Sequence, residues 1–258
     1  MNLFSVCLVA QNEQENLPRL LESVQGLADE IIVVDGGSED RTQEIARDHG
    51  AKVFFRPFTN HADQKNYAAS FASHDWIFLL DADEELSGEL RESVRLWKTR
   101  QTRFAVYEMP RLTWYLGEWI RHSRWYPDYQ QRLYRRDQAS FSGVIHSALR
   151  HDGPVGRLRG NLLHYTVRTF QEHEAKLEKY TTAIAREMFD QGRQNWRAAM
   201  WFAPPWSWFH HFILGAGFLD GYRGAVIARM AARGVRMKFQ KLGALVEAEK
   251  RAGNRGAA

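Results

Sequence analysis

The chain has 258 residues, of which 44% are hydrophobic and 26% are charged, and its formal net charge is +4. This composition predicts one large globular domain, or one domain with an appendage, and it excludes wholesale disorder. The single cysteine, Cys7, lies in an apolar run and cannot form an internal disulfide, which fits a reducing compartment. The first residues lack the basic segment of a signal peptide, and we expect no membrane-spanning helix because no run of 18 apolar residues occurs.

Apolar strands alternate with helical segments along the first 80 residues. We expect strands over residues 3–10, 30–34, 51–56 and 76–80, with helices over residues 15–27, 39–50 and 65–72 between them. This alternation predicts a mostly parallel α/β sheet, in which ligands bind beyond the carboxyl ends of the strands. Polar residues stand at three of those ends, namely Asn12, Glu13, Asp35, Asp81 and Asp83. No P-loop and no dinucleotide-binding glycine motif is present, so both of those functions are disfavoured.

The stretch WIFLLDADEE, residues 76–85, is the most informative strand end. In an extended chain alternate side chains share a face, so Asp81 and Asp83 are expected to point the same way, with Ala82 between them. Carboxylate oxygens at this spacing suit Mg²⁺ or Mn²⁺. The alternative is a strand followed by the acidic first turn of a helix. Helix capping by Asn12 and Glu13, and a simple tight turn at Asp35, are the corresponding alternatives at the other ends.

Four blocks of this sequence resemble the donor half of a known enzyme family. SVCLVAQNEQENLPRLLESV, EIIVVDGGSEDRT, DQKNYAAS and DWIFLLDADEEL resemble, in order and spacing, the nucleotide-sugar-binding half of family 2 glycosyltransferases of GT-A fold. The resemblance covers roughly residues 3 to 110. It implies that the donor is a nucleotide-diphosphate sugar, with UDP-glucose favoured, and that a divalent cation stabilises the leaving diphosphate.

The same resemblance assigns roles to individual residues. It implies that the nucleotide-sugar is bound by Ala10, Asn12, Glu13, Asp35, Ser38, Lys65, Asp81 and Ala82. In this assignment Ser38 stabilises the turn beside Asp35, and Lys65 lies near the pyrophosphate or the base. Asp81 approaches the ribose or the metal, and Asp83 is the direct metal ligand. A solvated lysine at a helix start is the alternative for Lys65.

Residues 111–167 resemble the acceptor half of small family 2 enzymes that add sugars to the lipopolysaccharide core. PDYQQRLYRR and FSGVIHS match a pattern like P-D-x-Q-x-R-L-F-R-R followed by F-x-G-x-x-H-E, except that Tyr134 replaces the Phe conservatively and Ser147 replaces the final Glu. The same tract, from QRLYRR to SFSGVIHSAL, predicts a β-hairpin. The departure at Ser147 leaves the identity of the catalytic base open.

An inverting transfer needs a group that accepts the proton of the acceptor hydroxyl. Asp128 is the first candidate, and His146 is the second, either as the base or as a metal or diphosphate ligand. Arg132, Arg135 and Arg136 could clamp phosphates of the donor or of a phosphorylated acceptor. The alternatives are a turn aspartate, a hydrogen-bonded strand histidine and a solvated basic strand face.

The C-terminal third changes in composition. Residues 168–192 predict a helix, and residues 195–222 then combine four Trp and four Phe with a Pro-Pro break. Residues 223–241 carry six basic residues and no acidic one. Aromatic residues followed by basic ones predict helices that lie in a membrane interface. A helical hairpin packed on the catalytic domain, or in an oligomer interface, is the alternative.

These observations predict an organisation and a function. Residues 1–110 form the nucleotide-sugar-binding half, residues 111–167 the acceptor side, and residues 168–258 a membrane-associated helical region. We expect an inverting, metal-dependent glycosyltransferase that acts on a lipid-linked acceptor, the lipopolysaccharide core, as a peripheral protein at the cytoplasmic face of the inner membrane. Transfer to a polyprenyl-phosphate or capsular intermediate, and a non-catalytic nucleotide-binding scaffold, remain alternatives. Nucleic acid is not an expected partner, because the acidic strand ends would repel it and no binding motif is present.

Overall fold

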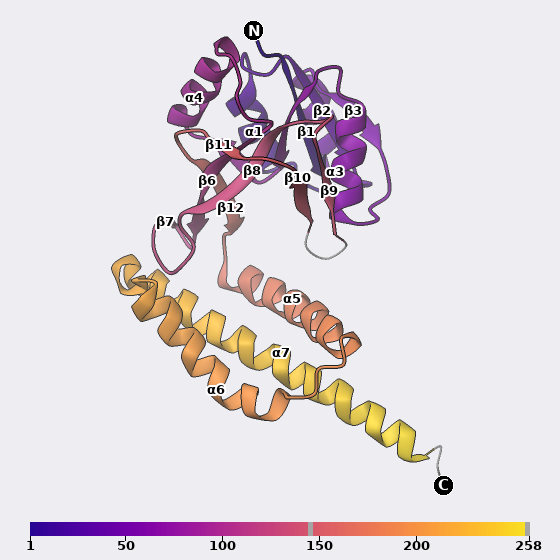
Figure 1. Ribbon diagram of the computed structural model, residues 1–258, viewed down its shortest axis with the longest axis vertical. Coiled ribbons are helices and arrows are strands. Elements are labelled where there is room, and N and C mark those ends of the chain that lie inside the picture. Colours follow the sequence, from indigo (N-terminus) through magenta and orange to yellow (C-terminus); the bar gives the residue numbers. More distant parts are fainter. Residues whose placement is uncertain (144–146, 256–258) are drawn as a thin grey trace. The chain divides into compact units, whose positions relative to one another are not determined.

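The structure, a computed structural model, describes residues 1–143 and 147–255 (Figure 1). It divides the chain into two compact units. The first unit consists of Met1–Leu112 and Pro127–Tyr165, and the second consists of Thr113–Tyr126 and Thr166–Ala258. The chain therefore enters the second unit twice, first with the short segment Thr113–Tyr126 and then with the whole C-terminal segment from Thr166 onward.

The first unit holds most of the strands and four helices. The strands are β1 (Phe4–Ala10), β2 (Glu30–Asp35), β3 (Lys52–Phe55), β4 (Trp76–Asp81), β5 (Glu84–Leu86), β6 (Val106–Tyr115), β8 (Asp128–Arg135), β9 (Ala139–Ser142), β10 (Ala148–His151), β11 (Val155–Arg157) and β12 (Leu162–Val167). The helices are α1 (Leu17–Val24), α2 (Thr42–Asp48), α3 (His61–Ser70) and α4 (Gly88–Thr99). β6 and β12 run on into the second unit.

The main sheet has the strand order β3-β2-β1-β4-β8-β6-β12-β5. The first four strands pair in parallel, as the alternation of strands and helices predicts. β8 then pairs antiparallel with both β4 and β6. The carboxyl ends of β1, β2, β3 and β4 consequently lie at one edge of the sheet, and their amino ends lie at the opposite edge.

Helices cover both faces of the parallel strands, which explains their continuous apolar runs. Successive residues of β1 point to opposite faces, so Leu8 joins the core under α1 and α4, while Cys7 joins the core under α3. Leu8 and Cys7 are both fully buried. The regular burial of alternate side chains fixes the register of the central strands.

One expectation about local structure is wrong, one alternative is excluded, and one predicted helix is shorter than expected. The predicted hairpin does not form: β8 inserts between β4 and β6, and β9 pairs with β10 instead. The chain turns at Ala82 and continues as the short strand β5, so the acidic residues after Asp81 do not begin a helix, and α4 starts only at Gly88. The helix expected over residues 15–27 is limited to Leu17–Val24.

The second unit contains β7 (Glu118–Ile120) and the C-terminal helices. These helices are α5 (Phe170–Asp190), α6 (Trp196–Phe209), the π-helix η1 (His210–Leu214), the 3₁₀ helix η2 (Gly217–Asp220) and α7 (Gly221–Arg255). The break predicted at Pro204 and Pro205 is absent from the described residues: α6 continues through both prolines. None of the helices in the described residues combines the length and apolar character needed to cross a bilayer.

Candidate functional site

The polar strand ends lie side by side in the first unit. Ala10, the last residue of β1, pairs with Asp35 of β2, and Val9 pairs with Asp81 of β4. Parallel strands with matched ends bring these residues to one edge of the sheet. The loops after β1, β2 and β4 therefore meet there, in the position where α/β sheets bind ligands.

The turn after β2 is organised by Asp35. Its carboxylate, which is fully buried, accepts hydrogen bonds from the backbone N–H groups of Gly37 and Ser38, both at 3.0 Å, and from Gln43 at 2.8 Å. The Ser38 hydroxyl donates to the same carboxylate at 2.5 Å and accepts from the backbone N–H of Asn12 at 2.9 Å. These bonds tie the loop after β1 to the loop after β2. Direct contact of Asp35 with a nucleoside stays a prediction.

The loop after β1 has an unusual backbone. Asn12 has a φ of 57°, in the left-handed region that side chains other than glycine rarely adopt, although Asn tolerates it. Its side-chain oxygen accepts from the backbone N–H of Glu39 at 2.9 Å. The backbone N–H of Glu13 donates to Thr42 at 2.8 Å, and its carboxylate accepts from Asn16 at 2.7 Å. No capping hydrogen bond from the Asn16 side chain holds the start of α1.

A cluster of charged side chains lies at the end of β4. Arg132 of β8 is 3% exposed, and its guanidinium contacts the carboxylates of Asp81 and Glu84, the latter at 2.5 Å. Lys65 of α3 lies 3.3 Å from the second oxygen of Asp81. The backbone N–H of Asp81 donates to Glu84 at 2.9 Å. Two carboxylates and two cations therefore form one connected network, which we call the strand-end cluster.

The pKa values of these groups reflect burial opposed by ion pairing. Burial alone would raise the pKa of Asp81, but Arg132 and Lys65 outweigh it and hold that pKa well below its usual range. Burial raises the pKa of Glu84 despite the nearby Arg132. Burial lowers the pKa of Lys65 more than the Asp81 carboxylate raises it. Asp81 is thus held as a carboxylate, and its oxygens face cations of the protein.

Asp83 faces different partners. The turn at Ala82, which is 4% exposed, separates Asp83 from the extended geometry of β4, so the expectation of a shared face for both aspartates rests on a wrong backbone conformation. The Nε2 atom of His164 lies 3.2 Å from a carboxylate oxygen of Asp83. β12 pairs with β5 so that His164 stands opposite Glu84, which brings the imidazole to this place. The Nδ1 atom of His164 is buried and has no hydrogen-bond partner among the residues that the structure describes.

Asp128 lies at the start of β8, opposite Arg111 of β6. The Arg111 guanidinium donates twice to one oxygen of Asp128, at 2.6 and 3.0 Å, and Gln130 donates to the other at 2.8 Å. Arg111 also lies 3.7 Å from Glu84, so it connects Asp128 to the strand-end cluster. The Asp128 side chain is 38% exposed, which leaves its carboxylate accessible from outside the protein.

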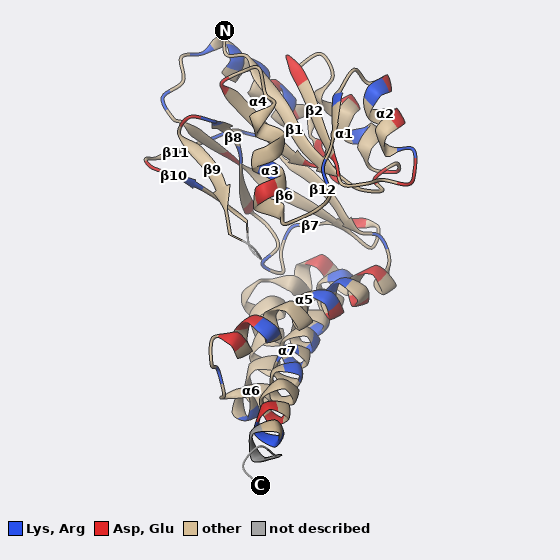
Figure 2. Ribbon diagram, turned by 90° about the vertical axis from the view of Figure 1, so that its right-hand side faces the viewer, with Lys and Arg blue, Asp and Glu red and all other residues tan. Residues whose placement is uncertain are grey.

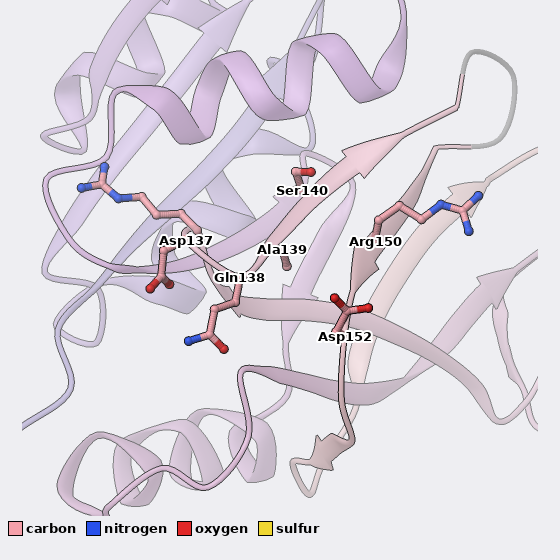
Figure 3. Close-up of a pocket in the computed structure, with 7 residues that line it drawn as sticks. Asp137, Gln138, Ala139, Ser140, Arg150 and Asp152 are labelled. Atoms are coloured by element: carbon pink, nitrogen blue, oxygen red, sulfur yellow. The ribbon is translucent and has the colours of Figure 1, made fainter.

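Two other predicted residues, Arg135 and Arg136, are not brought to this edge. Arg136 follows Arg135, which pairs with Trp76 at the start of β4, so it lies at the opposite end of that strand and donates to the Ala72 carbonyl at 2.6 Å. It lines a shallow polar pocket with Asp137, Gln138, Ala139, Ser140, Arg150 and Asp152 (Figure 3). His146 lies outside the described residues, so its roles as base and ligand stay predictions.

Sequence reasoning missed three residues of this site, namely Glu84, Arg111 and His164. Glu84 follows the DAD stretch directly, and the sequence alone presents it only as part of an acidic run. Arg111 and His164 lie on strands whose partners are distant in sequence, so only the pairing of β6 with β8 and of β12 with β5 reveals their place. An arginine and a histidine inside otherwise apolar or alternating strands are the only signals that could have pointed to them.

Comparison with known proteins identifies the family of this chain. The model of glycosyl transferase family 2 matches residues 5–150. An uncharacterized glycosyltransferase of Rickettsia typhi is 31% identical over 252 residues, which cover 90% of this chain and 84% of that protein. The lipopolysaccharide core biosynthesis glycosyltransferase LpsC of Rhizobium meliloti is 27% identical and covers 90% of each chain. Among solved structures, S. aureus TarS 1-349 in complex with UDP-GlcNAc is 15% identical, covers 97% of this chain and 92% of that one, and has a TM-score of 0.49. The chain belongs to glycosyl transferase family 2 and is a glycosyltransferase.

Proposed function

We propose that this enzyme transfers a sugar, with inversion, from a nucleotide-diphosphate donor to a lipid-linked acceptor of the lipopolysaccharide core. The similarity to LpsC along 90% of both chains supports the acceptor class. UDP-glucose is the proposed donor, as the family resemblance of the sequence implies. The proposed location is the cytoplasmic face of the inner membrane, where the protein acts as a peripheral enzyme.

The observation that carries this proposal is the pairing of Asp83 with His164 beside the strand-end cluster. A carboxylate oxygen and an imidazole nitrogen 3.2 Å apart can both bind one divalent cation. Within the described ranges no group of three His, Cys, Asp or Glu side chains could hold a metal. The two side chains fit a cation that takes its remaining ligands from water and from donor phosphates, as Mg²⁺ and Mn²⁺ commonly do. The nitrogen ligand favours Mn²⁺ over Mg²⁺.

When bound, the cation stabilises negative charge on the departing diphosphate. The chain's own residues supply the remaining functions. Lys65 adds positive charge at the same edge of the sheet, and Arg132 keeps Asp81 ionised and fixed. Asp128 accepts the proton of the acceptor hydroxyl, while Arg111 and Gln130 hold its carboxylate in one orientation.

The proposal can be tested by calorimetric titration of UDP, GDP, dTDP and CMP into the whole protein, with Mn²⁺ and again with EDTA. We expect one nucleoside diphosphate to bind with Mn²⁺ and to lose most of its affinity in EDTA. Mn²⁺ binding itself, followed by electron paramagnetic resonance, should weaken in Asp83→Ala and in His164→Ala. Asp137→Ala is the matched control, because that exposed aspartate lies at the opposite end of the sheet. If no nucleotide binds to protein with a normal unfolding transition, the proposed donor site is wrong.

A further inference from the structure

The second unit contains a long segment without formal charge. Residues 198–219, which span most of α6 together with η1 and most of η2, contain no Lys, Arg, Asp or Glu. The segment is instead rich in Trp, Phe, Ile and Leu. A surface helix normally carries charged residues on the face turned away from its neighbours. The outward face of a segment without charged residues is suited to contact with an apolar partner instead of water.

The outward face of this segment is strongly apolar. α6 turns Pro204 and Ser207 inward, where they are buried, and Trp196 packs against α7 at Gly243. The side chains left exposed include Trp201 at 67%, Phe202 at 77% and Trp206 at 59%. The apolar exposure continues from the end of α6 through residues of η1, η2 and the start of α7, namely Phe209, Ile213, Leu214, Phe218, Leu219 and Tyr222. We call all nine of these side chains the aromatic surface.

The spacing of these residues places them on one continuous side of the helix. Phe202, Trp206, Phe209 and Ile213 recur at intervals of three and four residues, which is the helical repeat. Trp206 and Phe209 lie with ring centroids 5.9 Å apart, and Phe212 contacts Phe218 across the turn between η1 and η2 at 6.3 Å. Exposed apolar residues scattered singly are normal, but a contiguous patch of this kind marks an interaction site.

The basic residues of the same unit identify the partner. Residues 193–241 carry eight Lys and Arg side chains and one acidic residue, Asp220. Four of the eight, Arg197, Arg223, Arg233 and Lys241, form ion pairs with glutamates of the same unit, so the unpaired positive charge comes from Arg193, Arg229, Arg236 and Lys238 within the described residues. Asp220 does not offset them at the surface, because its side chain is 6% exposed and accepts hydrogen bonds from His122 and from the backbone of Arg121. Figure 2 shows several of the basic residues in blue along α7. Positive charge beside exposed Trp and Phe is complementary to an anionic lipid surface.

The depth of insertion is limited by length and by composition. α6 has 14 residues, which is too short to cross the hydrocarbon region of a bilayer. Tryptophan rings prefer the headgroup level, where the indole N–H remains hydrated. Both facts favour a helix that lies in the plane of the interface.

We propose that the aromatic surface docks the enzyme on a bilayer that contains anionic lipid, with α6 lying in the interface. This inference adds the contact surface to the proposed function. It depends on that function only for the location of the acceptor, because the docking itself requires neither donor nor acceptor.

The test uses flotation of the full-length protein with vesicles of phosphatidylcholine, alone or mixed with phosphatidylglycerol. We expect binding to the mixed vesicles and much weaker binding to phosphatidylcholine alone. The triple variant W201S/F202S/W206S should lose at least about a hundredfold in partitioning, because three large apolar side chains no longer insert. Phe58→Ser is the matched control, since Phe58 is 50% exposed but belongs to the first unit.

Two further measurements keep the outcome clear. Brominated lipids should quench the tryptophan fluorescence of the unmodified protein, a result that does not require any variant to fold. The triple variant should bind nucleoside diphosphate as the unmodified protein does, which separates failure of docking from failure of the donor site. Unchanged flotation of the triple variant, equal binding to both vesicle types, or a dimer that buries the aromatic surface without binding lipid would each overturn the proposal.

Discussion

Ion pairs lie at both ends of the parallel strands in the first unit, but the two ends differ in how completely the polar atoms of their ionisable side chains are paired. At the amino end, the carboxylate of Glu30 accepts hydrogen bonds from Lys52 at 2.6 Å and from Ser5 at 2.5 Å. It also accepts from the backbone N–H and the hydroxyl of Ser73, both at 2.8 Å. Lys98 pairs with Asp29 nearby at 2.8 Å. This end is a closed network that ties β1, β2 and α4 together.

The carboxyl end is incompletely paired. Arg132 contacts two carboxylates, but within the described part of the chain its buried Nε has no hydrogen-bond partner, and the buried Nδ1 of His164 also lacks one. Unmatched buried polar atoms cost stability and persist mostly where function requires them. The comparison therefore teaches that the same strands carry a stabilising network at one end and a ligand-binding arrangement at the other. Substitutions at the two ends should separate stability from activity.

The largest expected effect is on activity, at Asp83. Asp83→Ala should reduce Mn²⁺-dependent turnover of the nucleotide-sugar by at least about a thousandfold, because it removes the carboxylate that would hold the cation. Its free energy of unfolding should change by no more than about 1 kcal/mol, since the side chain is partly exposed. Turnover assays and urea unfolding measure the two quantities. Full activity in this variant would rule out the metal role.

Arg132 should affect both quantities. Arg132→Met leaves Asp81 and Glu84 without their shared cation, so we expect a loss of about 3–5 kcal/mol in the free energy of unfolding, together with loss of donor binding. Arg135→Met is the control on the same strand, because Arg135 pairs with Asp137 at the surface and should cost at most about 1 kcal/mol. Equal losses in the two variants would show that the strand-end cluster is not a buried ionic network.

Glu30 should affect stability alone, with a defined dependence on pH. Burial would raise the pKa of Glu30, but hydrogen bonds from Lys52, Ser5 and Ser73 outweigh it and lower that pKa from 4.5 to about 2. The stabilisation is therefore fully present above about pH 4.5 and is lost as the pH falls toward 2. We expect Glu30→Gln to cost about 2–3 kcal/mol at neutral pH.

Urea unfolding of both proteins across this pH range checks the prediction. The difference in unfolding free energy should shrink steadily below pH 4.5. Nucleotide binding should remain unchanged in Glu30→Gln, because Glu30 lies at the end of β2 opposite to Asp35. A constant difference at every pH would mean that the hydrogen bonds of Glu30 do not depend on its charge.

Much of the fold could be predicted because its signals are local. The predicted α/β sheet and the C-terminal helical region are confirmed, since periodicity and apolar runs specify elements within a few residues of sequence. The GT-A fold, which the family resemblance implies, is confirmed as well. The β8–β9 hairpin was wrong because pairing partners are chosen by long-range packing, which places β8 between β4 and β6. The break at Pro204 was wrong because tertiary contacts of α6 with α7 override a local preference.

The site was predictable only in part, for the same physical reason. The alternation of strands and helices brings together the residues at the ends of parallel strands and in the helices between them. Asp35, Lys65, Asp81 and Asp83 are such residues, so their proximity could be predicted. His164 and Arg111 reach the site through antiparallel strands whose register no local pattern specifies. Asp81 pairs with Lys65 and Arg132 instead of sharing a face with Asp83. This difference depends on the turn at Ala82, which an assumption of extended backbone could not reveal.

The smallest expected effect concerns the backbone at the carboxyl end of β1. Asn12→Ala and Asn12→Gly both remove the hydrogen bond to Glu39, so they differ only in the conformation that residue 12 must adopt. With a φ of 57°, alanine should be less stable than glycine by about 1 kcal/mol. Gln25, at the opposite edge of the sheet with a φ of −60°, should show the reverse order, since glycine there only adds entropy to the unfolded chain. Urea unfolding of the four variants measures both differences. The same order at both positions would mean that the strained backbone at Asn12 is absent in solution, and the carboxyl end would then lose one of the features that distinguish it from the amino end.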